Sequence, residues 1–142
     1  MRLILVSVGN DALGGSSARH ALSTAGASNP VARYSQGIAA AGLVFTAGQG
    51  AHDPVTGELP EGIEAQTRRT LENVEAILRA GGASLASTLK ITVYLADRQD
   101  YAAMNAAYDE YMPDAPPVRT TVQAGLGNGM LVEIDAVALA SS

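Results

Sequence analysis

The feature that most constrains the fold is one long helical pattern between two groups of strand-like segments. Over residues 63–80, apolar and small side chains recur every three or four positions, which is the period of an amphipathic helix. Gly81 and Gly82 follow the last turn, and glycine often ends a helix. A helix with one apolar face must bury that face, here against a sheet. The stripe predicted to face inward consists of Ile63, Thr67, Thr70 or Leu71, Val74, and Ile77 or Leu78.

Alternating segments on both sides of this helix predict the sheet. Two strands precede it, one beginning at residue 34 and one over 43–49. A strand over 88–96 leads into a second helix at 101–112, with Asp100 as its N-cap and Pro113 after its end. Two last strands, 118–124 and 130–139, flank the sequence GLGNG, which predicts a hairpin turn. The order ββαβαββ indicates an α+β fold, a mixed sheet with two helices packed on one face.

The first 28 residues differ from the rest of the chain. The sequence GNDALGGSSARHALSTAGAS is small, polar and aperiodic, which is typical of a flexible segment. The preceding LILVSV is β-prone and is suited to pairing with a sheet edge. We therefore expect a flexible N-terminal arm over residues 1–28 and a single domain over residues 29–142. A chain of 142 residues is long enough for one core.

The composition excludes several classes of site and partner. There is no cysteine, so disulfides, thiolate zinc sites and cysteine nucleophiles are excluded. The two histidines, His20 and His52, are too few and too far apart for a metal cluster, and we expect no metal. A net charge of −5, with nine scattered basic residues, argues against a nucleic-acid partner. The apolar run near residues 3–6 is too short for a membrane span, and no convincing signal-peptide cleavage site follows, so we expect a cytoplasmic protein.

Two charged residues of the last strands, Arg119 and Glu133, are candidates for a site. Arg119 lies in PPVRTTVQ, a strand-like run that two prolines introduce. If the last two strands pair as an antiparallel hairpin, Arg119 and Glu133 become near neighbours across the strands. The pattern alone favours a surface ion pair of little energetic value. The adjacent His52 and Asp53 lie on a predicted turn, where a solvated turn is a better interpretation than a catalytic dyad.

Eight motifs, taken together, resemble one known family. They are YSQGI (34–38), LVFTAGQ (43–49), DPVTGEL (53–59), EAQTRRTLENVEAIL (64–78), KITVYLAD (90–97), NAAYDEY (105–111), PVRTTV (117–122) and VEIDAVA (132–138). Their order and spacing resemble those of the RidA (YjgF) family of reactive-intermediate deaminases over about residues 24–139. The resemblance implies a chorismate-mutase-like α+β subunit that forms homotrimers with clefts between subunits. A sheet covered on one face only also leaves its other face to be buried by a partner.

The resemblance implies a cofactor-free hydrolase. Its expected substrates are reactive 2-enamine and 2-imine acids, which it converts to 2-keto acids and ammonia. Examples are 2-aminoacrylate, as 2-iminopropanoate, and 2-iminobutanoate, which pyridoxal-phosphate-dependent dehydratases release from serine and threonine. Such a substrate carries a carboxylate beside the reacting carbon, and a planar guanidinium binds a carboxylate through two charge-assisted hydrogen bonds.

Seven positions of this chain match residues of the family's site. Arg119 matches the carboxylate clamp, and Glu133 matches the acidic residue that orients water and acts as general acid or base. Tyr34 matches a tyrosine that borders the site. The expected catalytic residues are therefore Arg119, Glu133 and Tyr34, and the expected substrate-binding residues are Arg119, Thr121, Gly48, Asn105 and Tyr101.

The chain departs from the family pattern at several positions. Thr121 stands where many relatives have cysteine, Ala47 where serine is common, and Arg33 where proline usually precedes the tyrosine. Gln123 and the AGLGNG turn replace a longer, more basic loop. Substrate preference depends on these positions more than reaction class does.

Two alternative functions stay open on the sequence. One is an endoribonuclease or translation-inhibiting activity, which the acidic net charge disfavours. The other is a non-catalytic metabolite-binding module that uses the same cleft, because a fold alone does not establish catalysis.

Overall fold

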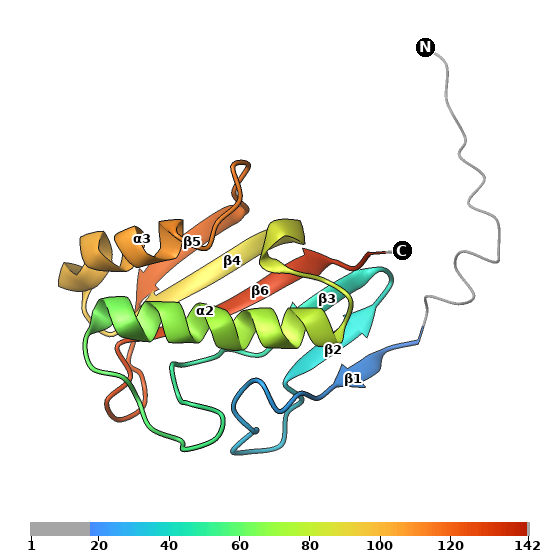
Figure 1. Ribbon diagram of the computed structural model, residues 1–142, viewed down its shortest axis with the longest axis horizontal. Coiled ribbons are helices and arrows are strands. Elements are labelled where there is room, and N and C mark those ends of the chain that lie inside the picture. Colours follow the sequence, from blue (N-terminus) through green and yellow to red (C-terminus); the bar gives the residue numbers. More distant parts are fainter. Residues whose placement is uncertain (1–17, 142) are drawn as a thin grey trace, which may run out of the picture.

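The computed structural model describes residues 18–141, which form one mixed sheet with two helices on one face (Figure 1). The strands lie in the order β1-β2-β3-β6-β4-β5 across the sheet. The α+β class with a chorismate-mutase-like sheet is therefore confirmed. The strands are β1 (His20–Leu22), β2 (Gly37–Ala40), β3 (Leu43–Thr46), β4 (Thr88–Leu95), β5 (Val118–Gln123) and β6 (Val132–Leu139). The helices are α2 (Ile63–Ala80) and α3 (Tyr101–Asp109), with single 3₁₀ turns η1 (Leu85–Ser87) and η2 (Arg98–Asp100).

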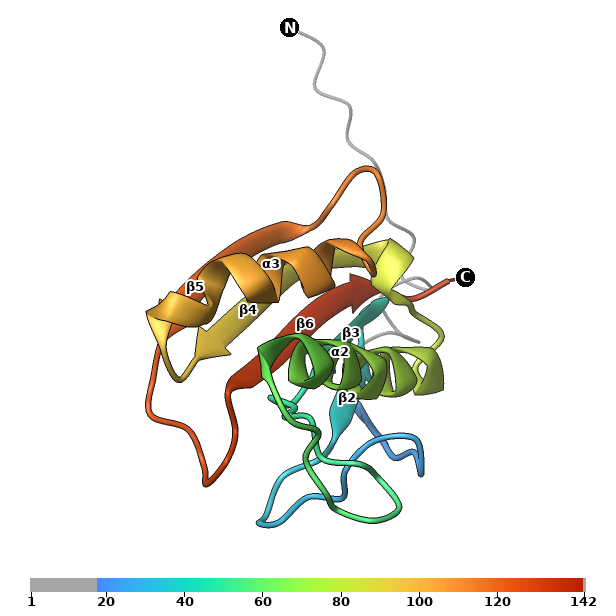
Figure 2. The same cartoon turned by 60° about the vertical axis from the view of Figure 1, so that its left-hand side comes forward.

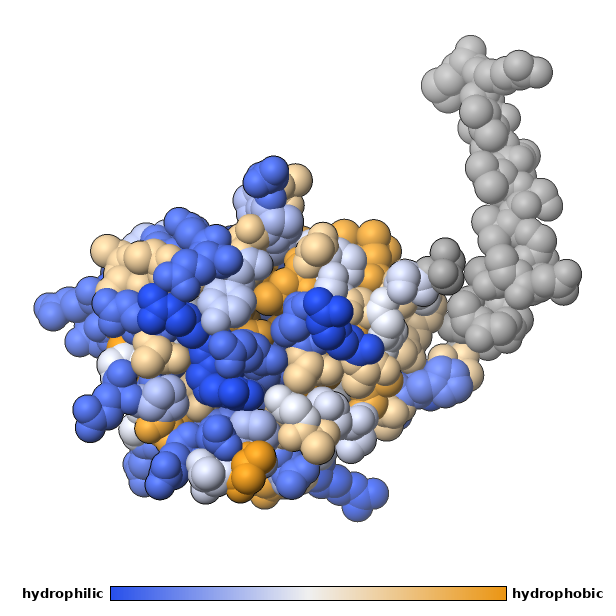
Figure 3. All heavy atoms as spheres, viewed as in Figure 1, coloured by the Kyte–Doolittle hydropathy of each residue, from blue (hydrophilic) through white to orange (hydrophobic). Residues whose placement is uncertain are grey.

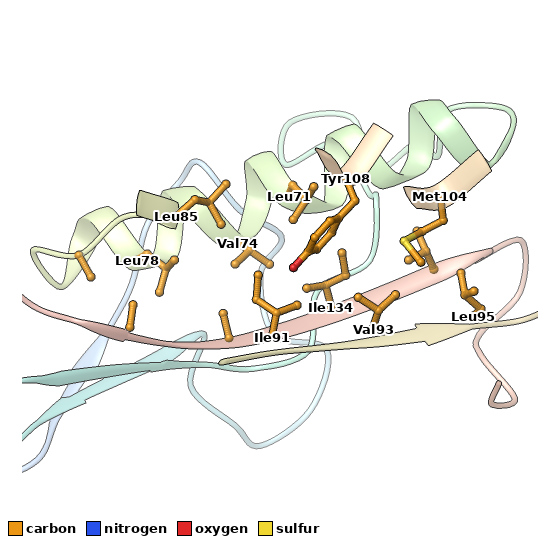
Figure 4. Close-up of a cluster of buried hydrophobic side chains, with 14 of the residues drawn as sticks. Leu71, Val74, Leu78, Leu85, Ile91, Val93, Leu95, Met104, Tyr108 and Ile134 are labelled. Atoms are coloured by element: carbon orange, nitrogen blue, oxygen red, sulfur yellow. The ribbon is translucent and has the colours of Figure 1, made fainter. Parts of the chain in front are cut away.

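Helix α2 has the predicted bounds, and every position of the predicted stripe is buried. Leu71, Val74 and Leu78 are fully buried against Ile91 of β4 and its neighbours on the sheet (Figure 4). Burying a side chain of this size stabilises a protein by about 1.5–3 kcal/mol. The core between helices and sheet therefore supplies the rigid frame on which the strand residues are placed.

Helix α3 is shorter than the sequence predicts. It ends at Asp109 rather than at residue 112, because the amides of Tyr111 and Met112 donate to carbonyls three residues back and tighten the last turn. Asp100 precedes the helix without forming a side-chain cap. Asp97 takes that role one turn earlier, since its carboxylate accepts a hydrogen bond from the Gln99 amide.

Strand β4 lies between β5 and β6, so the predicted hairpin of the last two strands is wrong. It pairs antiparallel with β6 and parallel with β5. Parallel neighbours need a crossover connection, and α3 provides it over this part of the sheet (Figure 2). Residues 124–131, which include GLGNG, therefore connect two strands that do not touch. Arg119 pairs with Ile91, and Glu133 pairs with Tyr94, so the two charges are not cross-strand neighbours.

Part of the segment assigned to the N-terminal arm belongs to the sheet. Strand β1, which the sequence pattern does not predict, pairs antiparallel with β2. The buried side chain of Gln36 donates to the carbonyls of Thr24, Ala27 and Ser28 and accepts from the Thr24 amide. Residues 24–28 are thereby held against the domain. The β-prone LILVSV lies outside the described residues, so its pairing with a sheet edge stays a prediction.

The two faces of the sheet differ in character. On the side with the helices, hydrophilic residues gather over the middle and left of the view, and more apolar residues lie toward the right (Figure 3). On the other face, Phe45, Val118, Val122 and Leu139 are all exposed. No helix within residues 18–141 combines the length and the apolar character needed to cross a bilayer.

The close packing of β2 on α2 can be tested at Gly37. A Cβ at this position would lie 2.6 Å from Ile77 Cγ2 and 3.0 Å from the carbonyl oxygen of Phe45. We expect Gly37→Ala to lower the free energy of unfolding by about 1–3 kcal/mol, as overpacking does. Gly125→Ala is the matched control, because a Cβ there meets nothing within 4 Å. Denaturant unfolding of both variants checks the prediction, and equal stabilities would contradict it.

Candidate active site

Three of the predicted site residues line one hollow at an end of the sheet. The hollow has a volume of about 500 Å³, and its walls include Tyr34, Gly48 and Glu133. Residues 50–57, which follow β3, form much of the remaining wall. The structure therefore brings together residues from three separate motifs.

Glu133 projects into this hollow from β6. Its Oε2 lies only 2.7 Å from where a Cβ on residue 48 would be, so glycine is needed at Gly48 for the carboxyl group to lie there. Reciprocal backbone hydrogen bonds of 2.9 Å between Gln49 and Ile134 keep the two segments together. Within residues 18–141, the Glu133 carboxylate takes part in no hydrogen bond or ion pair. It is therefore open to a ligand.

The environment of Glu133 favours the protonated carboxyl. Burial, and to a lesser extent the nearby Asp135, raise the pKa of Glu133 above its ordinary value. A carboxyl with a raised pKa can hold a proton closer to neutral pH and release it to a substrate. This is the behaviour expected of a general acid or base.

The loop that closes the hollow is attached to α2. The Asn73 amide donates to the carbonyls of Gly50 and His52 at 3.0 and 2.9 Å. Arg69 donates two hydrogen bonds to the Asn73 oxygen and fixes its orientation. Asp53 starts the next turn by accepting hydrogen bonds from the Val55 and Thr56 amides. These hydrogen bonds hold the loop after β3 in place, and none of them involves the Glu133 carboxyl.

The remaining predicted residues form a second group around β5 and α3. The Arg119 guanidinium lies over the rings of Tyr101 and Tyr108, with its Cζ 5.7 and 4.7 Å from their centroids. Its Nη2 also donates to the Tyr101 hydroxyl at 3.1 Å. Two such contacts restrict the guanidinium at a gain of about 0.5–2 kcal/mol each. Within residues 18–141, no carboxylate forms an ion pair with Arg119.

Unused polar groups accompany Arg119. The Asn105 Oδ1, the Tyr108 hydroxyl and the Thr121 Oγ1 are buried and have no hydrogen-bond partner among the described residues. The Asn105 side chain, followed by the Arg119 guanidinium, lowers the pKa of Tyr101. Tyr101 and Thr121 also line a hollow of about 700 Å³ beside β5. Groups of this kind are suited to a small polar ligand, because an unmade buried hydrogen bond is costly.

Arg119 and Glu133 lie on opposite faces of the sheet. Side chains of paired residues share a face, and successive residues alternate. Arg119 pairs with the buried Ile91 under the helices, whereas Glu133 pairs with Tyr94, three residues further along β4. One chain therefore carries two separate groups: Tyr34, Gly48 and Glu133 in the first, and Tyr101, Asn105, Arg119 and Thr121 in the second.

Sequence reasoning missed several residues of both groups. His52, interpreted as part of a solvated turn, lines the hollow of Glu133 together with Met130. Tyr108 packs under Arg119, and the α-helical spacing from Tyr101 would have indicated it. Strand alternation does place Asp135 on the same face as Glu133, two residues further along β6, but the sequence assigned it no role. Within residues 18–141, no group of three or more potential metal ligands occurs.

Comparisons with known proteins agree with this arrangement of motifs. The sequence model of a family described as Endoribonuclease L-PSP matches residues 24–140. TdcF of Escherichia coli, which carries the name of a reactive intermediate deaminase, is 36% identical over 125 residues, covering 85% of this chain and 97% of TdcF. The chain belongs to the RidA (YjgF) family. A RutC family protein of Pyrococcus horikoshii is 46% identical over 117 residues, 81% of this chain and 93% of that protein.

Solved RidA-family structures share the fold. The crystal structure of E. coli TdcF with bound serine has a TM-score of 0.80 at 36% identity, covering 86% of this chain and 99% of that one. The structure of the YjgF gene product of E. coli has a TM-score of 0.79 at 32% identity, covering 84% of this chain and 98% of that one. The family relationship therefore extends over nearly the whole described domain.

The raised pKa of Glu133 predicts a pH-dependent effect on stability. Folding favours the protonated carboxyl. The contribution of Glu133 to the free energy of unfolding is therefore complete below its ordinary pKa of 4.5, and it is lost as pH rises through the raised pKa. The stability of Glu133→Gln minus that of wild type should therefore be larger at pH 7, where the wild-type carboxylate is destabilising, than at pH 4. Thermal melts at both pH values check this, with the exposed Glu61→Gln as control. A stability difference that is independent of pH would contradict the prediction.

Proposed function

We propose that this RidA-family protein hydrolyses reactive 2-imine acids and their 2-enamine tautomers to 2-keto acids and ammonia. The observation that carries the proposal is Arg119, which has no carboxylate partner within residues 18–141 and lies over two tyrosine rings of α3. The second support is an unpaired carboxyl with a raised pKa, Glu133, in a hollow. 2-Iminopropanoate and 2-iminobutanoate are the expected substrates, and the chemistry needs no cofactor.

Arg119 is assigned to the substrate carboxylate. A guanidinium offers two parallel N–H donors that match the two carboxylate oxygens. The tyrosine rings limit its motion before the ligand arrives, so less entropy is lost on binding. The presence of serine in the TdcF crystal structure supports a site for small amino-acid-like molecules in this family. Thr121, Asn105 and Tyr101 supply further polar contacts.

Glu133 is assigned to proton transfer. Water adds across the C=N bond: the C–O bond forms, the π electrons move to nitrogen, and Glu133 carries a proton from water to that nitrogen. The C–N bond then breaks with its electron pair on nitrogen, while Glu133 carries the hydroxyl proton to the leaving ammonia. One imine and one water thus give one keto acid and one ammonia. Tyr34 and Gly48 border the hollow in which this occurs.

A complete site requires more than one copy of the chain. Because Arg119 and Glu133 lie on opposite faces of one sheet, a small substrate is best shared between Arg119 of one subunit and Glu133 of another. The exposed apolar side chains of the uncovered sheet face, among them Phe45 and Val118, are suited to burial in such an assembly. The resemblance to the family gives the number of subunits as three, a homotrimer with sites between subunits.

Arg119 provides the most direct test of the activity. Arg119→Ala should lower turnover by roughly 30- to 1000-fold, since a lost charge-assisted contact in an active site costs about 2–4 kcal/mol. Arg119→Lys should restore little, because an ammonium lacks the planar pair of donors. A dehydratase that generates the imine, followed by keto-acid release with and without the protein, measures turnover. Melting temperatures serve as the folding control, and retained turnover in Arg119→Ala would end this assignment.

Mixed assemblies test whether the site is shared between copies. Arg119→Ala and Glu133→Gln should each be nearly inactive as pure trimers. After unfolding and refolding together, random trimers should regain up to about a quarter of wild-type activity, because one interface in four joins an intact arginine to an intact glutamate. Light scattering and native mass spectrometry confirm trimers and mixing. Verified mixed trimers with no regained activity would show that both residues act within one chain.

Ribonuclease activity is the second candidate, because the matching family bears that description. The net charge of −5 weighs against it, since RNA binding needs a cluster of basic residues. An RNA-cleavage assay at matched ionic strength, run beside the imine assay on the same preparations, separates the two activities.

A further inference from the structure

A second carboxylate lies beside Glu133 and is held in a fixed orientation. Glu133 and Asp135 are two residues apart on β6, so both project from the face of the sheet that the helices leave uncovered. The hydroxyl of Tyr94 donates to Asp135 Oδ2 at 3.0 Å. Tyr94 is also the direct cross-strand partner of Glu133. One tyrosine is therefore next to both carboxyl groups.

The Tyr94 hydroxyl donates to Asp135, and within the described part of the chain Glu133 receives no hydrogen bond. A tyrosine hydroxyl has a single hydrogen, and here that hydrogen is used on Asp135. On its other side Glu133 meets Gly48, which offers no side chain. The two carboxyl groups are thus treated differently although they share one strand: one is anchored and the other is open to the hollow.

The other ionisable groups facing Glu133 do not offset this neighbour. On this face β5 presents Val118, Thr120 and Val122 beside β4, and β3 presents Phe45; none of these side chains is ionisable. Lys90 of β4 pairs with Val137, beyond Asp135, and takes part in no salt bridge among the described residues. Tyr34, His52 and Asp53 line the same hollow as Glu133. The Asp53 carboxylate is occupied by two backbone amides.

We propose that Asp135, oriented by Tyr94, is a positioning residue that keeps a proton on Glu133 until the departing nitrogen takes it. The inference rests on the proposed function and assigns that reaction's proton transfer to a pair of carboxyl groups rather than to one. A negative charge nearby disfavours a second negative charge, so Glu133 holds its proton more tightly while Asp135 is ionised. Burial is the larger cause of the raised pKa of Glu133, and the charge of Asp135 adds to it in the same direction.

Carbon-13 NMR tests the coupling without any substrate. The side-chain carboxyl signal of Glu133 is identified by its absence in Glu133→Gln and is followed against pH in the full-length protein. Asp135→Asn keeps an oxygen to accept from Tyr94 and removes the charge, so the titration midpoint of Glu133 should fall. Asp135→Thr, which is neutral and suits a strand, should lower it too if the asparagine variant folds poorly. An unchanged midpoint in the folded variants would overturn the proposal.

Steady-state kinetics test the consequence for catalysis. Asp135→Asn should lower kcat about tenfold at pH 8 and less at pH 6, with KM little changed, because only the supply of the proton is affected. A loss of equal size at every pH would indicate a merely structural role and overturn the proposal. Because the NMR titration needs no activity, a shifted midpoint in a protein without deaminase activity would refute the proposed function and leave the carboxyl coupling established.

The role of Tyr94 has a matched control elsewhere in the chain. The Tyr111 hydroxyl donates to Glu72 Oε1 at 3.0 Å, a bond of the same kind and length on the helical side. Tyr94→Phe should lower kcat several-fold, whereas Tyr111→Phe should leave it unchanged. Equal effects of the two substitutions on kcat would remove Tyr94 from the proposal.

Discussion

The structure depends on β4, the strand that pairs with β5 on one side and with β6 on the other. Its alternate residues Ile91, Val93 and Leu95 are buried under the helices, and the residues between them face away. Both neighbours take their register from this strand. Residues that pair with Ile91 lie on the face covered by the helices. Residues that pair with Tyr94 lie on the uncovered face. The positions of Arg119 and Glu133 follow from these two pairings.

Much of this fold could be predicted from local pattern. The bounds of α2 follow from apolar period and a glycine pair, since those signals lie within a few residues of one another. The pairing of the last strands could not be read in the same way. A short connection such as 124–131 is typical of a hairpin. However, the local sequence does not indicate whether a third strand lies between β5 and β6. The better signal was the strand–helix–strand order through α3, because a crossover helix usually joins parallel neighbours and leaves β6 to pair on the other side of β4.

The candidate site was predictable only in part for a similar reason. Arg119, Glu133 and Tyr34 lie in motifs that identify the family, and residue type and order were enough to make them candidates. Tyr94 and Tyr108 look like ordinary core or surface aromatics in the sequence, and their roles come from which charge they contact in space. The loop that contains His52 is held against α2 by Asn73, which is distant in sequence. The Asn73 side chain donates to the His52 carbonyl and accepts from Arg69. Contacts of this kind depend on tertiary packing and leave no local signature.

Keeping Arg119 and Glu133 apart has a physical consequence for binding. If the two strands had paired as a hairpin, the opposite charges would have neutralised each other in a weak surface ion pair. A ligand would then have had to break that pair before gaining its own contacts. Placing the charges on opposite faces of one sheet leaves each without a protein partner in the described part of the chain, while tyrosine rings and burial hold each in position. The same separation means that one subunit alone cannot present both charges to one small molecule. In the reaction that we propose, assembly is therefore a condition for chemistry, and the substrate would meet an arginine and a carboxyl group that do not neutralise each other.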